Sequence, residues 1–232
     1  MASLVSIRDL TKTYQRGPEK VEVLHGLDLD IEQGDFVALM GPSGSGKTTL
    51  LNLIGGLDTP SSGSIEVDGQ RIDRLGGGQL SHWRSQNVGY VFQFYNLMPA
   101  LSAQKNVELP LLLTRLGSAQ RKRNAQIALQ LVGLADRVSH KPGELSGGQQ
   151  QRVAIARAIV TEPQVLMADE PTGNLDTERS LEIMELLTDL NVRNGITVLM
   201  VTHEQDMADY AHTIVHFRDG LVEKTLTGAR HR

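Results

Sequence analysis

Residues 41–49 read GPSGSGKTT and match the phosphate-binding pattern G-x-x-x-x-G-K-[ST]. The stretch follows an apolar run at residues 36–40 and precedes a segment of helical character, which is the context that the pattern requires. Glycines let backbone N–H groups turn inward around phosphate oxygens, and the N-terminus of the next helix adds partial positive charge. We therefore expect a phosphate site built from Gly41, Pro42, Ser43, Gly44, Ser45, Gly46, Lys47, Thr48 and Thr49.

Two residues of this loop and two carboxylates could perform phosphate chemistry. Lys47 would reach the β- and γ-phosphates of a nucleotide, and Thr48 would place its hydroxyl on Mg²⁺. Asp169 and Glu170 follow an apolar run at residues 165–168. An aspartate there can hold Mg²⁺ through water, and the glutamate can polarise an attacking water as a general base. Alone, an Asp-Glu pair at a strand end is more often a solvated turn, but the phosphate loop favours the catalytic interpretation.

Two further polar residues come just after apolar runs. Gln93 follows the run at residues 88–92, and His203 follows the run at residues 197–201. A neutral amide can coordinate Mg²⁺ or the attacking water and release either easily. An imidazole can hydrogen-bond a terminal phosphate and hold the water. We therefore expect Gln93 and His203 to belong to the same site.

The segment LSGGQQQRVAIARA, residues 145–158, begins a second helix with glycines. Ser146 and Gln149 fit a capping box, which explains these two residues but not Gly147 and Gly148. Each glycine in a first helical turn costs up to ~1 kcal/mol relative to alanine. A helix start without side chains admits an anion to its free N–H groups, so the segment predicts a second phosphate-binding helix end. One nucleotide could meet both ends only if two copies of the chain face each other head to tail.

The surrounding pattern predicts an α/β fold. Residues 21–24 and 27–31 alternate in polarity, which indicates half-exposed antiparallel strands. The Asp-Gly pairs at 68–69 and 219–220 predict tight hairpins. The apolar runs at 36–40, 165–168 and 197–201 are typical of a parallel sheet covered by helices on both faces. Because ligands bind at the carboxyl ends of such strands, the polar residues after each run point to one site.

Between residues 94 and 160 the strand pattern stops, which predicts a mostly helical lobe inserted between sheet strands. Residues 106–116 and 120–132 are expected to be helices. The glycine run at residues 76–78 is interpreted as a flexible surface turn.

Composition excludes several classes of protein. The chain has 232 residues, no cysteine and a formal net charge of −4. Disulfides, thiol nucleophiles and cysteine–zinc sites are therefore absent, and no excess of positive charge indicates a nucleic-acid partner. No apolar run approaches the ~20 residues of a membrane span, and the start lacks the apolar region of a signal peptide. We expect a cytosolic chain that reaches a membrane only through a partner.

Taken together, the phosphate loop, Gln93, LSGGQ, LMADE, the GNLD stretch at 173–176 and His203 occur in one order along the chain. This combination resembles the ATP-binding subunits of ABC transporters over nearly all of the sequence. The resemblance implies a P-loop NTPase (RecA-like) core, an N-terminal antiparallel β-subdomain and an inserted helical subdomain. In that family two subunits sandwich two ATP molecules, each held by one subunit's phosphate loop and the other's LSGGQ.

Domain boundaries follow from the same resemblance. The chain is expected to be a single ATP-binding domain spanning residues 1–232. Residues 1–93 and 161–232 would form the nucleotide-binding core with its β-subdomain, and residues 94–160 would form the helical subdomain with the LSGGQ segment.

The resemblance also implies roles for individual residues. Tyr14 would stack on adenine, and Asp176 would communicate between the two sites. Ser146 would hydrogen-bond the γ-phosphate of the opposite subunit's ATP. Mg²⁺ would be held by Thr48, Gln93 and, through water, Asp169, while Lys47 and His203 would stabilise charge on the transferred group beside the general base Glu170.

Subfamily features point to a membrane partner. Residues 56–63, 88–111 and 168–176 resemble the branch that serves lipoprotein release, macrolide efflux and cell-division complexes. The resemblance implies a homodimer on the cytoplasmic side of the inner membrane, bound to an integral permease whose coupling helix docks at residues 94–111, where we expect exposed Tyr95, Leu97 and Met98. Two alternatives remain: a soluble ABC-type ATPase acting on DNA or ribosomes, and an ATP-dependent scaffold with little turnover.

Overall fold

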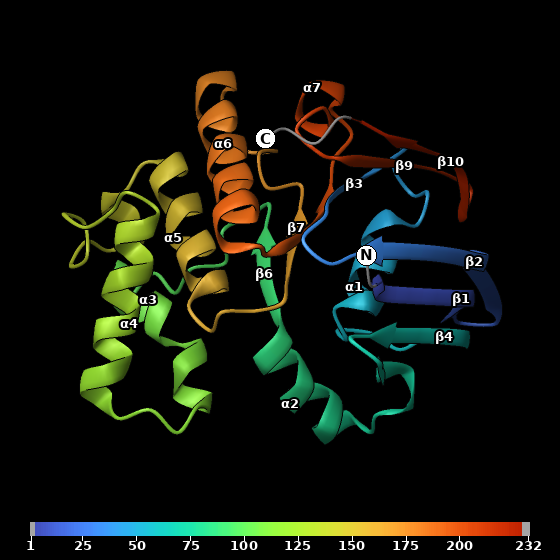
Figure 1. The fold of residues 1–232 in the computed structure, drawn as a ribbon, viewed down its shortest axis with the longest axis horizontal. Helices are drawn as coiled ribbons and strands as arrows, with labels where there is room; N and C mark the ends of the chain where they lie inside the picture. Colours follow the sequence, from blue (N-terminus) through green and yellow to red (C-terminus); the bar gives the residue numbers. More distant parts are fainter. Residues whose placement is uncertain (1–2, 229–232) are drawn as a thin grey trace.

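Two β-sheets and a group of helices make up the computed structural model, which describes residues 3–228 (Figure 1). The four-stranded sheet has the order β2-β1-β4-β5, and the six-stranded sheet has the order β10-β9-β3-β8-β7-β6. The strands of the first are β1 (Ser3–Arg16), β2 (Glu19–Glu32), β4 (Ser62–Val67) and β5 (Gln70–Arg71). Those of the second are β3 (Phe36–Met40), β6 (Val88–Phe92), β7 (Val165–Asp169), β8 (Thr197–Val201), β9 (Thr213–Arg218) and β10 (Leu221–Thr227).

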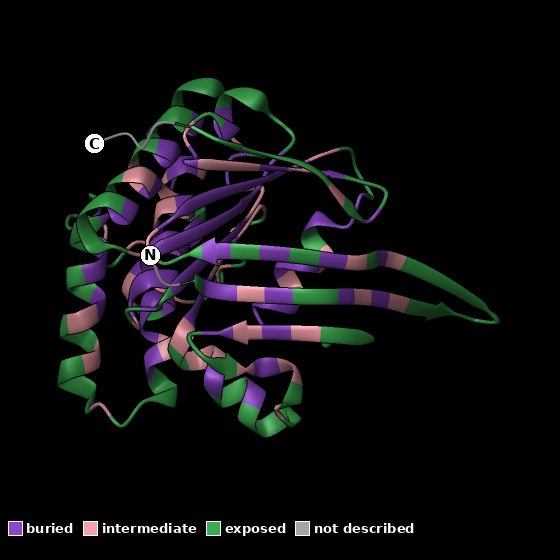
Figure 2. Ribbon diagram, turned by 45° about the vertical axis from the view of Figure 1, so that its right-hand side comes forward, coloured by how far each residue is buried: buried purple, intermediate pink, exposed green. Residues whose placement is uncertain are grey.

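The four-stranded sheet is antiparallel, as the alternating sequence predicts. Leu27, Leu29 and Ile31 of β2 are buried, and the residues between them are exposed. Figure 2 shows the alternation along the long strands, whose far ends project beyond the core. Asp68 and Gly69 both adopt positive φ, at 50° and 74°, and connect β4 to β5 in a tight hairpin. Both features confirm the prediction for this part of the chain.

The six-stranded sheet is parallel from β9 through β3, β8 and β7 to β6, with β10 antiparallel at its edge. Strands β3 and β8 are buried at every position, because helices or the other sheet cover both faces. The register pairs Phe92 with Asp169, and Asp169 with Val201. This register brings the carboxyl ends of β6, β7 and β8 side by side.

The longer helices are α1 (Lys47–Ile54), α2 (Gly77–Asn87), α4 (Ser118–Leu131), α5 (Gly147–Ile159) and α6 (Thr177–Asn194). Shorter ones are α3 (Ala103–Glu108) and α7 (Gln205–Ala208), with 3-10 turns η1 (Ile72–Arg74), η2 (Pro110–Leu113) and η3 (Pro142–Glu144). Helices α3, α4 and α5 gather on one side of the molecule (Figure 1). The elements described between residues 94 and 160 are therefore helical, while the exact limits of the lobe stay a prediction.

Two segments differ from the sequence-based expectation. The helix expected at residues 106–116 ends at Glu108, and Pro110 begins a separate 3-10 turn because proline has no N–H to continue the helix. The run at residues 76–78 is not a flexible turn. It begins α2, where the side-chain oxygen of Gln79 accepts a hydrogen bond of 3.3 Å from the Gly76 N–H. This hydrogen bond to the Gln79 side chain therefore outweighs the weak helix propensity of glycine.

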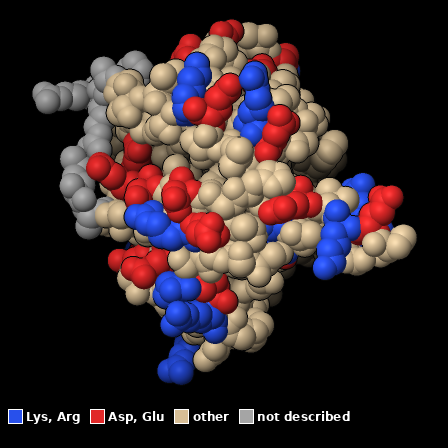
Figure 3. Space-filling view, turned by 90° about the vertical axis from the view of Figure 1, so that its right-hand side faces the viewer, with Lys and Arg blue, Asp and Glu red and all other residues tan. Residues whose placement is uncertain are grey.

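The parallel sheet separates two hydrophobic cores. Alternate residues of β3 face opposite ways: Phe36 and Ala38 pack with α3 to α7, whereas Val37 and Leu39 pack with α1 and the antiparallel sheet. No helix within residues 3–228 is long and apolar enough to cross a membrane. On the side that carries the antiparallel sheet, basic and acidic groups are intermixed (Figure 3). The observed fold is the α/β arrangement that the sequence predicts.

Candidate nucleotide site

The phosphate loop lines a cavity of about 380 Å³ at the carboxyl edge of the parallel sheet. Its lining residues are Tyr14, Arg16, Val23, Ser43, Gly44, Gly46, Lys47, Thr48, Thr49, Glu170 and Val201. A Cβ at Gly41 would lie 2.2 Å from the carbonyl oxygen of Phe217, and the φ of Gly41 is +150°. Gly46 precedes α1 with a φ of +100°, and a Cβ there would lie 2.8 Å from a methyl of Leu24. Only glycine fits these two positions, as a loop that closes on phosphates requires.

The ammonium of Lys47 is held inside the loop. Its Nζ donates hydrogen bonds of 2.8 Å to the carbonyl oxygens of Gly41 and Pro42 and lies 3.4 Å from the hydroxyl of Ser45. Burial lowers the pKa of Lys47, and the carboxylates of Glu170 and Asp169 act in the opposite direction. The loop thus holds a cation at the start of α1, where the helix dipole also favours an anion.

A hydroxyl and a carboxylate meet at the next position. The Thr48 hydroxyl donates a hydrogen bond of 3.0 Å to an Asp169 oxygen. Burial raises the pKa of Asp169; the Thr48 hydrogen bond and the Lys47 charge lower it, and the Glu170 charge raises it further. Both side chains offer the hard oxygen atoms that Mg²⁺ prefers. Within residues 3–228 no group of three or more His, Cys, Asp or Glu could hold a metal, so a Mg²⁺ here would need ligands beyond these types, such as hydroxyl, amide, phosphate and water oxygens.

Glu170 lies at the cavity in an unusual backbone conformation. Its φ is +48°, its N–H donates to the Val201 carbonyl at 3.0 Å, and its carbonyl accepts from Gly173 at 3.1 Å. A left-handed conformation costs an L-residue roughly 1–2 kcal/mol. His203 Nδ1 lies 3.2 Å from Glu170 Oε1. Glu170 therefore has a strained backbone, lies at the cavity and has an imidazole beside its carboxylate. These features fit the predicted general base.

Gln93 lies at the end of β6 next to the chain that follows Glu170. Its side chain packs on Gly173, where an added Cβ would come within 2.8 Å of Nε2. The backbone carbonyl of Gln93 accepts a hydrogen bond of 2.8 Å from the side-chain amide of Asn174. Within the described residues the hydrogen bonds of Gln93 do not include Thr48 or Asp169, so its role as a Mg²⁺ ligand stays a prediction.

The other end of the cavity is formed by the antiparallel sheet. Tyr14, near the end of β1, has an exposed fraction of 36%, and its Oη donates a hydrogen bond of 2.7 Å to Asp58. Arg16 and Val23 line the same cavity and were not predicted. Arg16 could have been found, because residues two apart on a strand share a face with each other. Val23 gave no signal, since only the pairing of β1 with β2 brings it there.

The LSGGQ segment begins α5 in the predicted capping box. The Gln149 N–H donates to Ser146 Oγ at 3.3 Å, and the Ser146 N–H donates to Gln149 Oε1 at 3.0 Å. Ser146, Gly148 and Gln149 line a second cavity of about 290 Å³, together with Gly133, Leu134, Arg152, Arg179 and Glu182. The two cavities share no lining residue, so one chain keeps its two glycine-opened helix starts apart.

Gly147 and Gly148 form this second helix start, and Asp176 lies beside it. A Cβ at Gly147 would lie 2.9 Å from the Tyr95 hydroxyl, and one at Gly148 would lie 3.2 Å from Cδ of Arg179. Asp176 caps α6 by accepting a hydrogen bond of 3.0 Å from the Arg179 N–H, and it also forms an ion pair with that guanidinium. Asp176 therefore lies beside the LSGGQ segment and away from the phosphate-loop cavity of its own chain.

The chain is similar to known ATP-binding proteins. The family described as "ABC transporter" matches residues 24–173. The lipoprotein-releasing system ATP-binding protein LolD of Geobacter metallireducens is 46% identical over 96% of this chain and 99% of its own length. The macrolide export ATP-binding/permease protein MacB of Bdellovibrio bacteriovorus is 47% identical over 95% of this chain, which spans 33% of that larger protein.

A solved structure extends the comparison to three dimensions. The dimeric ATP-binding cassette MJ0796, in a post-hydrolysis state bound to ADP and Pi, superposes with a TM-score of 0.88. It is 42% identical, with 96% of this chain and 98% of the cassette covered. With the motifs in their expected places on the expected fold, these similarities identify an ATP-hydrolysing cassette: the chain belongs to the ABC transporter family of ATP-binding proteins.

Proposed function

We propose that two copies of this chain close head to tail around two ATP molecules with Mg²⁺, and that hydrolysis drives an integral membrane permease of the lipoprotein-release or macrolide-efflux type. The observation that most supports this proposal is that one chain has two separate cavities, each at a helix that begins with glycines. A related cassette is a dimer bound to ADP and Pi. In a head-to-tail dimer the phosphate loop of one copy would face Ser146, Gly147 and Gly148 of the other.

The chain's own residues would divide the chemistry as follows. Glu170 takes a proton from the attacking water as general base, and His203, 3.2 Å away, orients that carboxylate. Lys47 and the N–H groups of the phosphate loop bind the β- and γ-phosphates, and the partner's signature serine adds a donor from the other side. Thr48, Gln93 and, through water, Asp169 would hold Mg²⁺, and the ion would supply positive charge that neutralises the phosphates.

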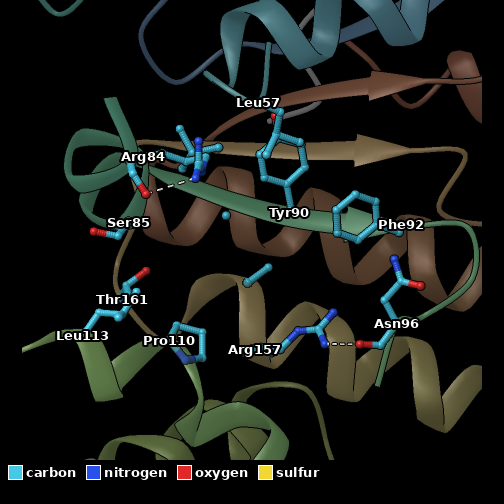
Figure 4. A pocket seen from close by; sticks show the side chains of 14 residues that line it. Leu57, Arg84, Ser85, Tyr90, Phe92, Asn96, Pro110, Leu113, Arg157 and Thr161 are labelled. Carbon is cyan, nitrogen blue, oxygen red and sulfur yellow. Dashed lines mark hydrogen bonds between the residues drawn. The ribbon is translucent and has the colours of Figure 1, made fainter. Parts of the chain in front are cut away.

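A groove of about 450 Å³ is the proposed permease contact. It lies between α2, β6, η2 and α5 and shares no lining residue with the other two cavities, and Figure 4 shows Tyr90, Phe92, Pro110 and Leu113 around it. Arg157 forms part of the wall, where its guanidinium donates hydrogen bonds of 2.6 and 2.9 Å to the carbonyls of Asn96 and Tyr95. An apolar hollow with fixed polar groups suits an inserted helix.

The exposure expected of the docking residues is found only in part. Tyr95 and Leu97 are only partly exposed, and Leu97 packs against the hydrophobic core. Met98 has an exposed fraction of 54%, but none of the three lines the groove. The segment turns its apolar groups partly inward because α5 holds its backbone through Arg157. Of the expected docking segment, 94–111, the groove includes Asn96 and Pro110.

Capture from detergent-solubilised membranes tests the permease proposal. Tagged Glu170→Gln protein, which should hold the closed dimer, is incubated with ATP and Mg²⁺ and the retained proteins are identified. We expect the retained protein to be an integral protein of the inner membrane, which binds this chain at its cytoplasmic side. Leu113, with an exposed fraction of 77%, gives a matched variant: Leu113→Glu should dimerise normally and lose that protein. Retention of only soluble partners by a demonstrably dimeric preparation would favour the soluble ATPase or scaffold alternative.

A further inference from the structure

Two charged residues, Lys12 and Asp58, form a support for the Tyr14 ring. Lys12 Nζ lies 4.7 Å from the centre of the Tyr14 ring. It also donates hydrogen bonds of 2.7 Å to Asp58 Oδ1 and to the Thr59 carbonyl. Asp58 Oδ2 accepts from the Tyr14 hydroxyl at 2.7 Å. One carboxylate therefore binds both the cation over the ring and the hydroxyl at its edge.

We propose that Lys12 and Asp58 are positioning residues for the nucleotide base. Lys12 covers one face of the Tyr14 ring and Asp58 fixes its hydroxyl, so the ring is held ready to stack a purine on its remaining face. This inference rests on the proposed role of Tyr14 as the stacking platform. Lys12 and Asp58 do not line the cavity themselves, so they act through Tyr14.

The burial of the Lys12 side chain indicates that its ammonium group stays with these partners rather than in solvent. Its exposed fraction is only 8%, which is unusual for lysine and requires paired partners. Burial raises the pKa of Asp58, but hydrogen bonds from Lys12 and Tyr14 outweigh it and hold that pKa below its usual value. For Tyr14, burial and the Asp58 hydrogen bond both raise the pKa, so the phenol stays a neutral donor.

The support is also tied to the phosphate loop. Asp58 follows α1, and its N–H donates to the Asn52 carbonyl of that helix at 3.2 Å. The same helix begins with Lys47 and Thr48. Beyond Asp58, the chain is fastened to β1 where the Ser61 N–H donates to the Thr11 carbonyl at 2.9 Å. A short, hydrogen-bonded path thus sets the separation between the stacking ring and the phosphate site, which pre-organises both ends for one nucleotide.

A double-mutant cycle with two probes tests this proposal. ADP and inorganic pyrophosphate are titrated into the full chain by calorimetry; ADP carries the base and pyrophosphate does not. Lys12→Met keeps most of the unbranched apolar side chain and removes the charged ammonium group. We expect its dissociation constant for ADP to rise roughly three- to tenfold, in the range of cation–π and stacking effects, with pyrophosphate binding unchanged. In a Tyr14→Ala background, Lys12→Met should cause no further change.

The controls separate this inference from the proposed role of Tyr14. Lys224→Met makes the same change on an exposed strand, β10, and should alter neither probe. If Tyr14→Ala leaves ADP binding unchanged, the role of Tyr14 is wrong. If Tyr14→Ala weakens ADP but Lys12→Met does not, only the positioning role is wrong. A Lys12→Met effect that persists without Tyr14, or that extends to pyrophosphate, also overturns it. Asp58→Asn provides the same test if Lys12→Met does not fold.

Discussion

His203 Nδ1 and Glu170 Oε1 lie 3.2 Å apart although the residues are 33 positions apart in the chain. Strands β7 and β8 pair in parallel register, with Asp169 opposite Val201, so the residues after each strand become neighbours. The Glu170 N–H then reaches across to the Val201 carbonyl and sets its left-handed backbone. The sheet register, more than any local feature, assembles the proposed base and its partner.

Replacing the proposed base should separate binding from turnover. Glu170→Gln keeps the size of the side chain and a hydrogen-bonding group toward His203, but it cannot accept a proton from water. We expect ATP turnover to fall by roughly 10²–10⁴-fold, the usual contribution of a general base, with little change in ATP affinity. Steady-state phosphate release and an ATP titration measure the two quantities. Turnover at the unsubstituted rate would remove Glu170 from this role.

Lys47 should matter for nucleotide binding itself. Lys47→Ala removes a cation held in the loop by two carbonyl oxygens. Hydrogen bonds to charged groups are worth about 1.5–3 kcal/mol, so we expect ADP affinity to fall by roughly 10- to 100-fold. Lys141→Ala, an exposed lysine before η3, is the matched control and should bind normally. Equal affinity of the Lys47 variant and the control would place Lys47 outside the site.

Two glycines should respond oppositely to alanine. At Gly41 a Cβ would lie 2.2 Å from the Phe217 carbonyl, and the φ is +150°, so Gly41→Ala should destabilise the fold. We expect a loss of about 2 kcal/mol in the free energy of unfolding, within the range of backbone clashes. At Gly78, in α2, no atom lies within 4 Å of a Cβ. Gly78→Ala should add about 0.5–1 kcal/mol from helix propensity. Urea unfolding compares the two; equal effects would contradict the loop geometry.

A buried amide connects α5 to the catalytic strand ends. Gln151 is fully buried, and its Nε2 donates hydrogen bonds of 2.6 Å to Pro171 and 3.4 Å to Phe92 carbonyls. Gln151→Leu removes the hydrogen bonds to both carbonyls, at a cost of about 1–3 kcal/mol in stability. Because Pro171 follows Glu170, we also expect kcat to fall by roughly tenfold, or about 1.4 kcal/mol, with ADP affinity unchanged. The neighbouring Gln150→Leu is the control; a loss of kcat no larger than in that control would argue against the connection.

Local patterns explain which parts were predictable from sequence. The phosphate loop, the apolar strands and the Asp-Gly hairpins depend on neighbouring residues, so their spacing was sufficient. The helix expected at residues 106–116 is interrupted because Pro110 has no N–H to continue it. The glycine run at residues 76–78 differs from the expected turn because the Gln79 side chain caps a helix start there.

Features assembled from distant segments were beyond reach. The Lys12–Asp58–Tyr14 support needs the end of α1 to meet β1, and the sequence gives no local sign of that contact. Val23 reaches the cavity only through the pairing of β2 with β1. The groove draws its residues from several elements, so no single segment of the sequence could have indicated it.

In the proposed dimer, the LSGGQ segment of one copy meets the nucleotide held by the other. Sedimentation velocity of Glu170→Gln protein with ATP and Mg²⁺, alone and with Gly148→Asp added, measures whether this contact holds the dimer together. Gly148 lines the second cavity and does not line the phosphate-loop cavity. The added carboxylate should therefore leave ATP binding to the monomer intact and repel the phosphates of the nucleotide held by the partner. We expect an ATP-dependent dimer for Glu170→Gln and a monomer that still binds ATP for the double variant. A dimer of equal stability in both proteins would contradict the head-to-tail arrangement.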